Sequence, residues 1–242
     1  MTLRVVGVVC ALASEARHLR PSEATRIALS GMGGAAATQS ARSLAEGGAE
    51  ALVSFGMAGG LDPSLVPGTV FLPSEVISAD GAVVIATDEP WREQVGARVA
   101  RSASDGRGSG RNGPRPPPLT SGRLLTTSKA VGTRADKALL FRQTGAAAVD
   151  MESLAIAEVA RSHKLPFLAV RVIVDSAFDT LPRAVTAAAD NEGHLQIGRL
   201  LGALARTPGE LPALIRLGQR YRAANRSLAA VARVGLSGGR VG

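Results

Sequence analysis

The 242-residue sequence has very few of the residues that build disulfides or metal centres. Its one cysteine, Cys10, excludes a disulfide within the chain and a cysteine-rich zinc site, and it suits a reducing compartment. The only histidines are His18, His163 and His194, and no two of them have the spacing of metal ligands. We therefore expect no bound metal.

Aromatic residues make up only 3% of the chain, so Ala, Val, Leu and Ile must form the core. With 45% hydrophobic and 20% charged residues, a large buried core is expected and global disorder is not. No apolar run approaches the roughly 18 residues of a membrane-spanning helix. The first apolar run is interrupted by Arg4, and we interpret it as a buried strand rather than a signal peptide. These features predict a cytoplasmic protein.

Lysine is also scarce, because Lys129, Lys137 and Lys164 are the only three, so arginine supplies most of the net charge of +8. A basic chain suits anionic partners such as phosphate, nucleic acid or a membrane surface. The arginines are scattered and not interleaved with aromatic residues, which disfavours nucleic-acid binding.

Strand-like and helix-like stretches alternate along the chain. Short apolar stretches predict strands at 3–10, 26–30, 51–55, 69–78, 82–86, 123–127 and 166–174. Longer stretches predict helices at 34–47, 91–104, 133–144, 151–163, 186–206 and 210–233. This alternation predicts a single α/β domain over 1–242, with a mixed, mostly parallel sheet between helices on both faces. The Gly-, Pro- and Arg-rich segment 105–118 predicts a mobile surface loop inserted in that domain.

Several carboxylates and two glycine-rich turns follow predicted strands. In α/β sheets ligands bind beyond the carboxyl ends of the strands, so these residues are candidates for one site: Glu15, Asp150, Glu152, Asp175 and the turns at 31–34 and 56–60. Each acid alone also fits a structural role. Asp150 and Glu152 could complement a helix N-terminus, and Asp175 could cap a helix or form a turn.

The glycine-rich segment 31–37 (GMGGAAA) loosely resembles a dinucleotide-binding fingerprint. That fingerprint requires an acidic residue at the end of the next strand, where this chain has Ser54, Phe55 and Gly56. A dinucleotide cofactor is therefore not expected. The glycines instead permit tight turns and close approach of a ligand to the backbone.

Three segments carry a resemblance to a known family: SGMG (30–33), FGMAGGL (55–61) and VDMESLAIAEVA (149–160). Each follows a predicted strand. Together with 7–19 and 169–179, they resemble the nucleoside phosphorylase and nucleosidase superfamily, in the branch of methylthioadenosine/adenosylhomocysteine nucleosidases. The DMES motif (150–153), LPRAV (181–185) and the tail 206–220 are most similar to hopanoid-associated phosphorylases, which are held to remove adenine from adenosylhopane.

The resemblance implies cleavage of the N-glycosidic bond of a purine nucleoside, with a 5′-modified adenosine as substrate. Glu15 matches the acid that activates water in hydrolytic members, and Asp175 matches the general acid that protonates the purine. Substrate contacts are implied for Met151, Glu152, Gly59 and Val131. No metal or organic cofactor is implied, although phosphate is a candidate co-substrate.

The nucleophile stays open between water and phosphate. If phosphate attacks, Arg17 or Arg171 is a candidate to hold it, although Arg171 could equally be a structural ion-pair partner. The chain also departs from the hydrolytic pattern at Ser128-Lys129 and in the loop 105–118, which leaves the contacts to the base open. Two alternatives remain: a catalytically inactive nucleoside-binding protein on the same fold, and a binder of phosphate-rich ligands.

The C-terminal stretch has apolar residues at near-helical spacing, with arginines between them: Leu211, Leu214, Leu217, Tyr221, Leu228 and Val231. We expect this stripe to pack on the domain, and peripheral contact with the inner face of a membrane is the alternative. Family members are usually homo-oligomers, often dimers, for which apolar surface near 55–72 is a candidate interface.

Overall fold

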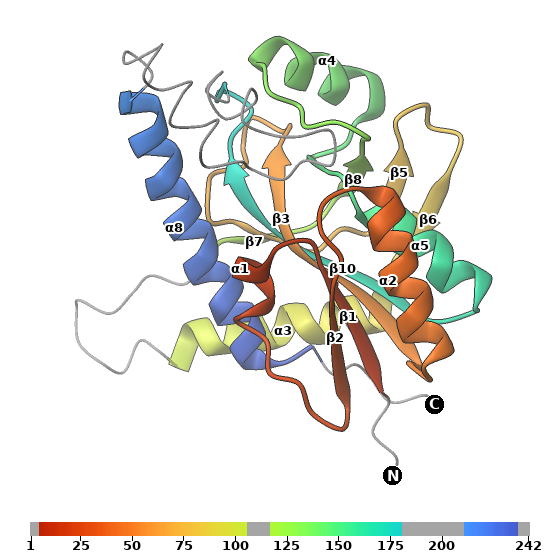
Figure 1. Cartoon of the computed structure of the whole chain (residues 1–242). Coiled ribbons are helices and arrows are strands. Elements are labelled where there is room, and N and C mark those ends of the chain that lie inside the picture. The colour runs from red at the N-terminus through yellow and green to blue at the C-terminus, as the bar shows by residue number, and fades with distance from the viewer. Residues whose placement is uncertain (1–4, 106–116, 181–210, 237–242) are drawn as a thin grey trace.

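The computed structural model describes residues 5–105, 117–180 and 211–236, which form one α/β domain (Figure 1). Its strands are β1 (Val6–Cys10), β2 (Thr25–Leu29), β3 (Ala51–Gly60), β4 (Val70–Phe71), β5 (Glu75–Ser78), β6 (Val84–Ala86), β7 (Leu119–Thr120), β8 (Arg123–Thr126), β9 (Ala148–Asp150) and β10 (Phe167–Asp175). Its helices are α1 (Ala13–Ala16), α2 (Gly34–Glu46), α3 (Glu89–Asp105), α4 (Arg134–Thr144), α5 (Ser153–Ser162) and α8 (Leu211–Val234).

The strands form one mixed sheet in the order β6-β5-β8-β9-β3-β10-β4-β7, with β1 joining β3 and β2 joining β1. Most pairs are parallel, and the antiparallel ones are β10 with β4, β3 with β9 and β5 with β6. The long strand β3 changes partners along its length. Its first half pairs with β1 from Ala51 to Ser54, and its last residues, Gly59 and Gly60, pair with β9.

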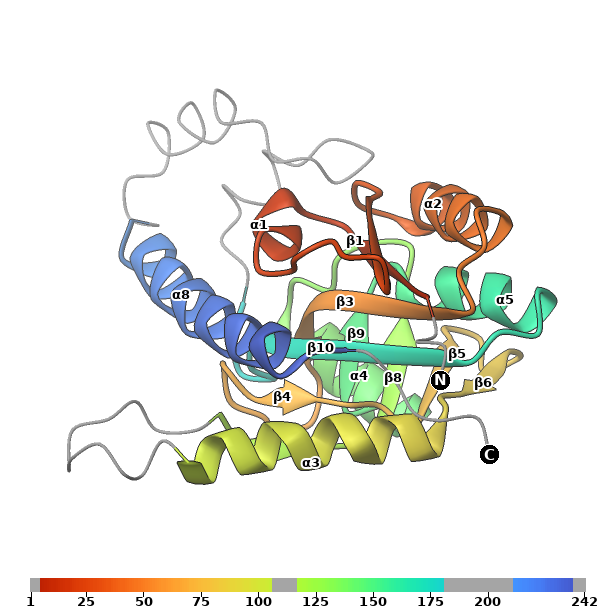
Figure 2. The same cartoon turned by 90° about the horizontal axis from the view of Figure 1, so that it is seen from below.

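Alternate residues of the central strands enter two separate cores. On β1, Val6, Val8 and Cys10 face the side covered by α3 and α8, whereas Val9 faces the side covered by α2 and α5. Figure 2 shows α2 and α3 on opposite sides of β3 and β10. A continuous apolar strand is therefore explained by burial on both faces, as the sequence predicted.

The helix α8 packs on the domain through the C-terminal half of its apolar stripe. Leu228 and Val231 are fully buried in the core that contains β1 and β10. Earlier along the helix, Leu217 and Tyr221 are half-buried and Ile215 is 55% exposed. The expectation that the stripe packs on the domain is thus confirmed for its C-terminal part. None of the helices in the described part of the chain is long and apolar enough to cross a membrane.

Most of the predicted helices and strands are confirmed, but the prediction of a glycine-rich turn at 56–60 is wrong. The chain stays extended there, as the second half of β3, because β9 and β10 both pair with it. The predicted strand 69–78 is interrupted and forms β4 and β5. The short strands β7 and β9 were not predicted. Most of the predicted loop 105–118 and all of the predicted helix 186–206 lie outside the described residues.

The apolar segment 55–72 is core rather than surface, which corrects the expectation that it offers an interface. Its large side chains are buried within the domain, at Phe55, Leu61, Leu65, Val70 and Phe71. Val66, at 51% exposure, is the one large apolar side chain of this segment on the surface.

Candidate active site

A cavity of about 190 Å³ lies where β3, β9 and β10 meet. Besides these strands, its walls are formed by α1 and the residues before it, the segments after β2 and β8, and the residues before α5. The lining is mainly apolar, and its titratable side chains are all acidic: Glu15, Asp150, Glu152 and Asp175. The position agrees with the rule that α/β sheets bind ligands at strand ends.

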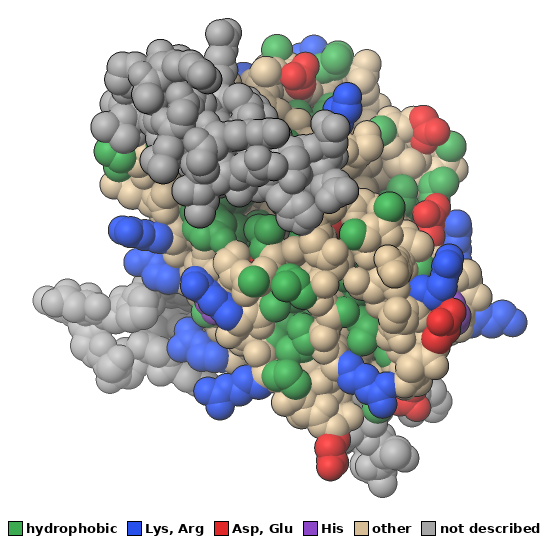
Figure 3. All heavy atoms as spheres, in the orientation of Figure 1, with side chains coloured by type: hydrophobic (Ala, Val, Ile, Leu, Met, Phe, Trp, Pro, Cys, Tyr) green, Lys and Arg blue, Asp and Glu red, His purple; other side chains and the backbone are tan. Residues whose placement is uncertain are grey.

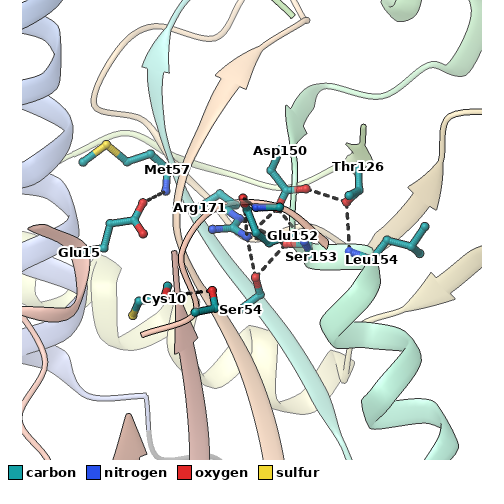
Figure 4. A network of polar contacts seen from close by, with 12 residues as sticks. Cys10, Glu15, Ser54, Met57, Thr126, Asp150, Glu152, Ser153, Leu154 and Arg171 are labelled. Carbon is teal, nitrogen blue, oxygen red and sulfur yellow. Dashed lines mark hydrogen bonds and ion pairs between the residues drawn. The ribbon is translucent and has the colours of Figure 1, made fainter. Parts of the chain in front are cut away.

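Glu15 is held rigidly by backbone groups. It lies in the short helix α1, directly after β1, and its side chain is only 3% exposed. Its Oε2 accepts the Leu12 N–H at 3.0 Å. Its Oε1 accepts the Met57 N–H at 3.0 Å, as Figure 4 shows. Burial raises the pKa of Glu15, although the nearby Arg171 guanidinium opposes the shift. A carboxylate held in one orientation by two backbone N–H groups is suited, in its ionised form, to act as a general base.

The guanidinium of Arg171, on β10, lies at the centre of the acidic cluster and is 2% exposed. Its Nη2 is 2.6 Å from Asp150 Oδ2 and 4.0 Å from Glu152 Oε2. It also donates to the hydroxyls of Ser54 at 2.6 Å and Ser153 at 2.9 Å. Figure 4 shows these groups converging between β3 and the start of α5. The structure therefore places Arg171 as an ion-pair partner of the site's carboxylates.

The glycines of β3 create the room for this arrangement. A side chain at Gly56 would place its Cβ 2.5 Å from Nη1 of Arg171 and 2.7 Å from Oε1 of Glu15, so one of these two side chains would have to move from the site. At Gly59 a Cβ would lie 3.3 Å from Oδ1 of Asp175. The groups that approach these two glycines closely are side chains of the protein itself, and they do so within a strand rather than a turn.

Asp150 and Glu152 connect the cluster to the helix α5. Asp150 accepts the Ser153 N–H at 3.1 Å and the Thr126 hydroxyl at 2.6 Å, so it also has the helix-terminal role that the sequence left open. Glu152 accepts the Gly33 N–H at 2.9 Å, which ties the glycine-rich turn after β2 to the site. Burial, with the negative charge of Asp150 added, raises the pKa of Glu152 to about 7.

Asp175 ends β10 and is 5% exposed. Its Oδ2 accepts a hydrogen bond from the ammonium of Lys137, a fully buried residue of α4. Burial raises the pKa of Asp175, and the charge of Lys137 opposes that shift. The raised pKa favours the protonated form of this buried carboxyl, which is the form that a general acid needs.

The structure brings together six of the eight residues predicted for the site, because these all line the cavity: Glu15, Asp175, Met151, Glu152, Gly59 and Val131. The two candidate phosphate-binding arginines do not line it. Arg171 is absent from the cavity lining, and its Nη2 is engaged by Asp150, Ser54 and Ser153. Arg17 lines a separate groove with α8. The geometry therefore gives no support to phosphate binding by these two residues at the cavity.

Three functional neighbours escaped the sequence analysis: Lys137, Ser54 and Ser153. Ser54 lies inside a predicted strand and Ser153 ends the DMES motif, but neither had an assigned role. Lys137 occurs in a helix that mixes polar and apolar residues, and a lysine there is normally exposed. Its scarcity, as one of three lysines in the chain, was the only signal available.

The fold and the acidic site define an α/β protein of the nucleoside phosphorylase type. The family model described as the phosphorylase superfamily matches residues 23–206. The chain therefore belongs to the phosphorylase superfamily, which comprises nucleoside phosphorylases and nucleosidases.

Curated relatives are the 5′-methylthioadenosine/S-adenosylhomocysteine nucleosidases of Mycobacterium bovis and Mycobacterium tuberculosis. Each is 27% identical to this chain over 221 residues, an alignment that covers 71% of this chain and 86% of the relative.

Among solved structures, that of the 5′-methylthioadenosine/S-adenosylhomocysteine nucleosidase of Neisseria meningitidis with methylthio-immucillin-A has a TM-score of 0.66 at 20% identity, covering 96% of this chain and 98% of that one. The futalosine hydrolase of Helicobacter pylori gives 0.62 at 16% identity, with coverage of 96% and 98%. These likenesses show a shared fold.

We predict that Glu152 makes folding stability depend on pH. Because its pKa is raised to about 7 in the folded state, the folded protein keeps a proton between about pH 4.5 and 7 that the unfolded chain releases. The contribution of this group is thus fully present below the unfolded pKa and is lost as pH rises through 7. Glu152→Gln should be increasingly more stable than wild type over this window, by on the order of 3 kcal/mol at most.

The measurement is urea unfolding from pH 4.5 to 8, on wild type, Glu152→Gln and the control Glu158→Gln. Glu158 lies on the same helix but is exposed, so its replacement should leave the pH dependence unchanged. Parallel curves for all three proteins would contradict the predicted role of Glu152.

Proposed function

We propose that the cavity cleaves the N-glycosidic bond of a purine nucleoside. One observation carries this proposal: Glu15, Glu152 and Asp175, which lie far apart in the sequence, line a single small cavity. Burial raises the pKa of each of these carboxyls, and raised carboxyl pKa values are typical of groups that take part in acid–base catalysis. The curated relatives, which are named as nucleosidases, support the same reaction class.

Asp175 is the general acid of the proposed reaction. A purine leaves poorly as an anion, so a proton delivered to its imidazole nitrogen as the bond breaks makes the leaving group neutral. Such assistance typically accelerates a reaction by about a hundredfold to ten-thousandfold. The sugar meanwhile develops positive charge, which the neighbouring carboxylates stabilise. Met151 packs against the ribose and Glu152 binds its hydroxyls, while Gly59 and Val131 border the base.

Water is the proposed nucleophile, activated by Glu15. Within the described residues the cavity is lined by four acids and by no lysine or arginine side chain. A phosphate anion would meet repulsion there, whereas a water molecule beside the fixed Glu15 carboxylate can lose its proton to it. This chemistry requires no metal or organic cofactor. Phosphorolysis is the alternative, and the added-phosphate arm of the assay below tests it.

The proposed substrate is a 5′-modified adenosine. Both curated relatives are named for 5′-methylthioadenosine and S-adenosylhomocysteine, so methylthioadenosine is the first candidate. Adenosylhopane is the second, and it rests on the likeness of 150–153, 181–185 and 206–220 to hopanoid-associated phosphorylases. A larger kcat/KM for one of the two would assign the 5′ substituent.

We predict release of free adenine from 5′-methylthioadenosine, adenosine or adenosylhopane in the absence of phosphate. Asp175→Asn should lower kcat by about a hundredfold to ten-thousandfold, because the purine then leaves without a proton. Glu15→Gln should lower it comparably, because the water is no longer activated. The assay is chromatographic detection of adenine with and without added phosphate.

Release of adenine only in the presence of phosphate would show that phosphate, and not water, is the nucleophile. No release from any of the three substrates, together with measurable nucleoside binding, would favour the alternative of a catalytically inactive nucleoside-binding protein. Binding of polyanions that collapses with salt, without release of base, would favour a phosphate-rich ligand instead.

We also propose that a basic groove between α1 and α8 contacts an anionic membrane surface. Arg17 and His18 meet Arg222 and Arg226 of α8 there, and no acidic side chain lines the groove among the described residues. The three arginines are exposed, and Figure 3 shows Lys and Arg side chains along the edge where α8 lies. Each basic residue near an anionic surface contributes on the order of 1 kcal/mol of attraction.

This groove predicts co-sedimentation with vesicles that contain phosphatidylglycerol but not with pure phosphatidylcholine vesicles. Arg222→Ala/Arg226→Ala should reduce the bound fraction, and so should added salt, because the attraction is electrostatic. Arg161→Ala, an exposed substitution on α5, is the control. Equal binding by the double variant and wild type would refute a membrane role for the groove.

A homodimer is the proposed assembly, by analogy with the superfamily. Leu29 of the edge strand β2 is 56% exposed, and Figure 3 shows apolar side chains on the face over α1 and β2. Apolar surface of this kind often marks an interface between subunits. Sedimentation velocity should give about twice the chain mass of 24.7 kDa, and a monomer at assay concentration would contradict the proposal.

A further inference from the structure

The proposed general acid has a buried cationic partner to which the reaction above gives no role. Lys137 lies in the first half of α4 and is 0% exposed, whereas Lys129 and Lys164 are exposed. Its Nζ donates to Oδ2 of Asp175 and, at 2.8 Å, to the backbone carbonyl of Ser176. The ammonium therefore has two fixed acceptors at the end of β10.

Stability alone does not explain a lysine at this position. Removing an ammonium group from water costs several kcal/mol, and a buried ion pair typically stabilises a fold no more than well-packed apolar residues would. The surroundings of α4 are apolar, because Leu140 and Phe141 pack on a cluster with Leu61 and Leu125. A charge retained in such a place points to a functional role.

The two carboxyl oxygens of Asp175 have different environments. Oδ2 is occupied by the Lys137 ammonium. Oδ1 is the oxygen nearer to Gly59, at 3.3 Å from the position that a Cβ would take there against 3.7 Å for Oδ2, and Gly59 forms part of the cavity wall. Lys137 thus fixes the rotation of the carboxyl group and leaves Oδ1 to the cavity.

We propose that Lys137 is the positioning residue of the general acid: it holds Oδ2 of Asp175 so that Oδ1 carries the proton into the cavity, and its charge stabilises the carboxylate left after proton transfer. This inference rests on the proposed function, and it names the residue that makes Asp175 an effective acid.

The proton balance is simple. As the C1′–N9 bond breaks, its electron pair passes into the purine, the O–H bond of Asp175 breaks and an N–H bond forms on the purine imidazole ring. Lys137 keeps its three protons throughout. The step leaves a neutral purine and a carboxylate–ammonium pair between Asp175 and Lys137, and Asp175 regains a proton from solvent after product release.

Other charged groups face Asp175 and must be considered with Lys137. Asp179 follows β10, and Arg220 of α8 lies 2.8 Å from Asp179, so these two largely neutralise each other. Glu15 and Glu152 line the same cavity from α1 and the start of α5. Lys137 is the cation in direct contact with Asp175, so its removal should have the largest effect on the acid.

The test compares two leaving groups in Lys137→Met. Purine release from 5′-methylthioadenosine needs the proton of Asp175, whereas 4-nitrophenyl β-D-ribofuranoside releases a phenolate that needs none. We expect kcat for methylthioadenosine to fall by about tenfold to a hundredfold. The nitrophenyl riboside should change by no more than about twofold. The alkaline limb of the kcat profile should move to higher pH, because loss of the cation raises the pKa of Asp175.

Two further variants separate charge from geometry. Lys137→Gln keeps a hydrogen-bond donor for Oδ2 without the charge, so it should show the same shift of the alkaline limb, and it replaces Lys137→Met if that variant does not fold. Lys137→Arg should restore part of the rate. Lys164→Met, the same change at an exposed lysine, is the control and should match wild type.

Equal losses on both substrates would overturn the inference, because they would indicate a purely structural lysine. An unchanged methylthioadenosine rate with an unshifted alkaline limb would overturn it as well. A wild-type protein that cleaves neither substrate would refute the proposed function itself, which distinguishes the two failures.

Discussion

The structure of the site depends on one buried cation, the guanidinium of Arg171. Three carboxylates, those of Glu15, Asp150 and Glu152, are buried around it, and each would be strongly destabilised if ionised without a positive charge nearby. The guanidinium can hydrogen-bond to several partners at once because its donors form a planar fork. It therefore lets acids from two separate segments, α1 and the junction of β9 with α5, occupy one small volume. Its positive charge offsets the repulsion among these carboxylates.

The backbone of β3 makes room for this cluster within the sheet. β3 carries glycine at the point where Arg171 and Glu15 pass closest to it, so the strand can remain extended and paired while the side chains cross over it. The same strand exchanges β1 for β9 along its length, which brings the start of α5 to the cluster. The residues of β3 thus determine both the strand pairing at the centre of the sheet and the position of the site.

Apolar periodicity and the spacing of acids predicted much of this arrangement from sequence. Uninterrupted apolar stretches predicted a mostly parallel sheet. The positions of Glu15, Glu152 and Asp175 after predicted strands indicated that these acids share one site. Local pattern failed where contacts between distant segments determine the backbone conformation. The glycine-rich segment 56–60 is typical of a turn, but pairing with β9 and β10 keeps it extended. The contact between Lys137 and Asp175 joins residues 38 positions apart, so no local pattern could reveal it.

The burial of Cys10 has a practical consequence for studying this molecule. The thiol lies in the core beneath Glu15, is fully inaccessible, and has its pKa raised to about 12 by burial and by the negative charge of Glu15. Alkylating reagents attack the thiolate, so the native chain is close to inert toward them near neutral pH. A cysteine introduced on the surface would then be the single labelled position, so spectroscopic probes can be attached without first replacing Cys10.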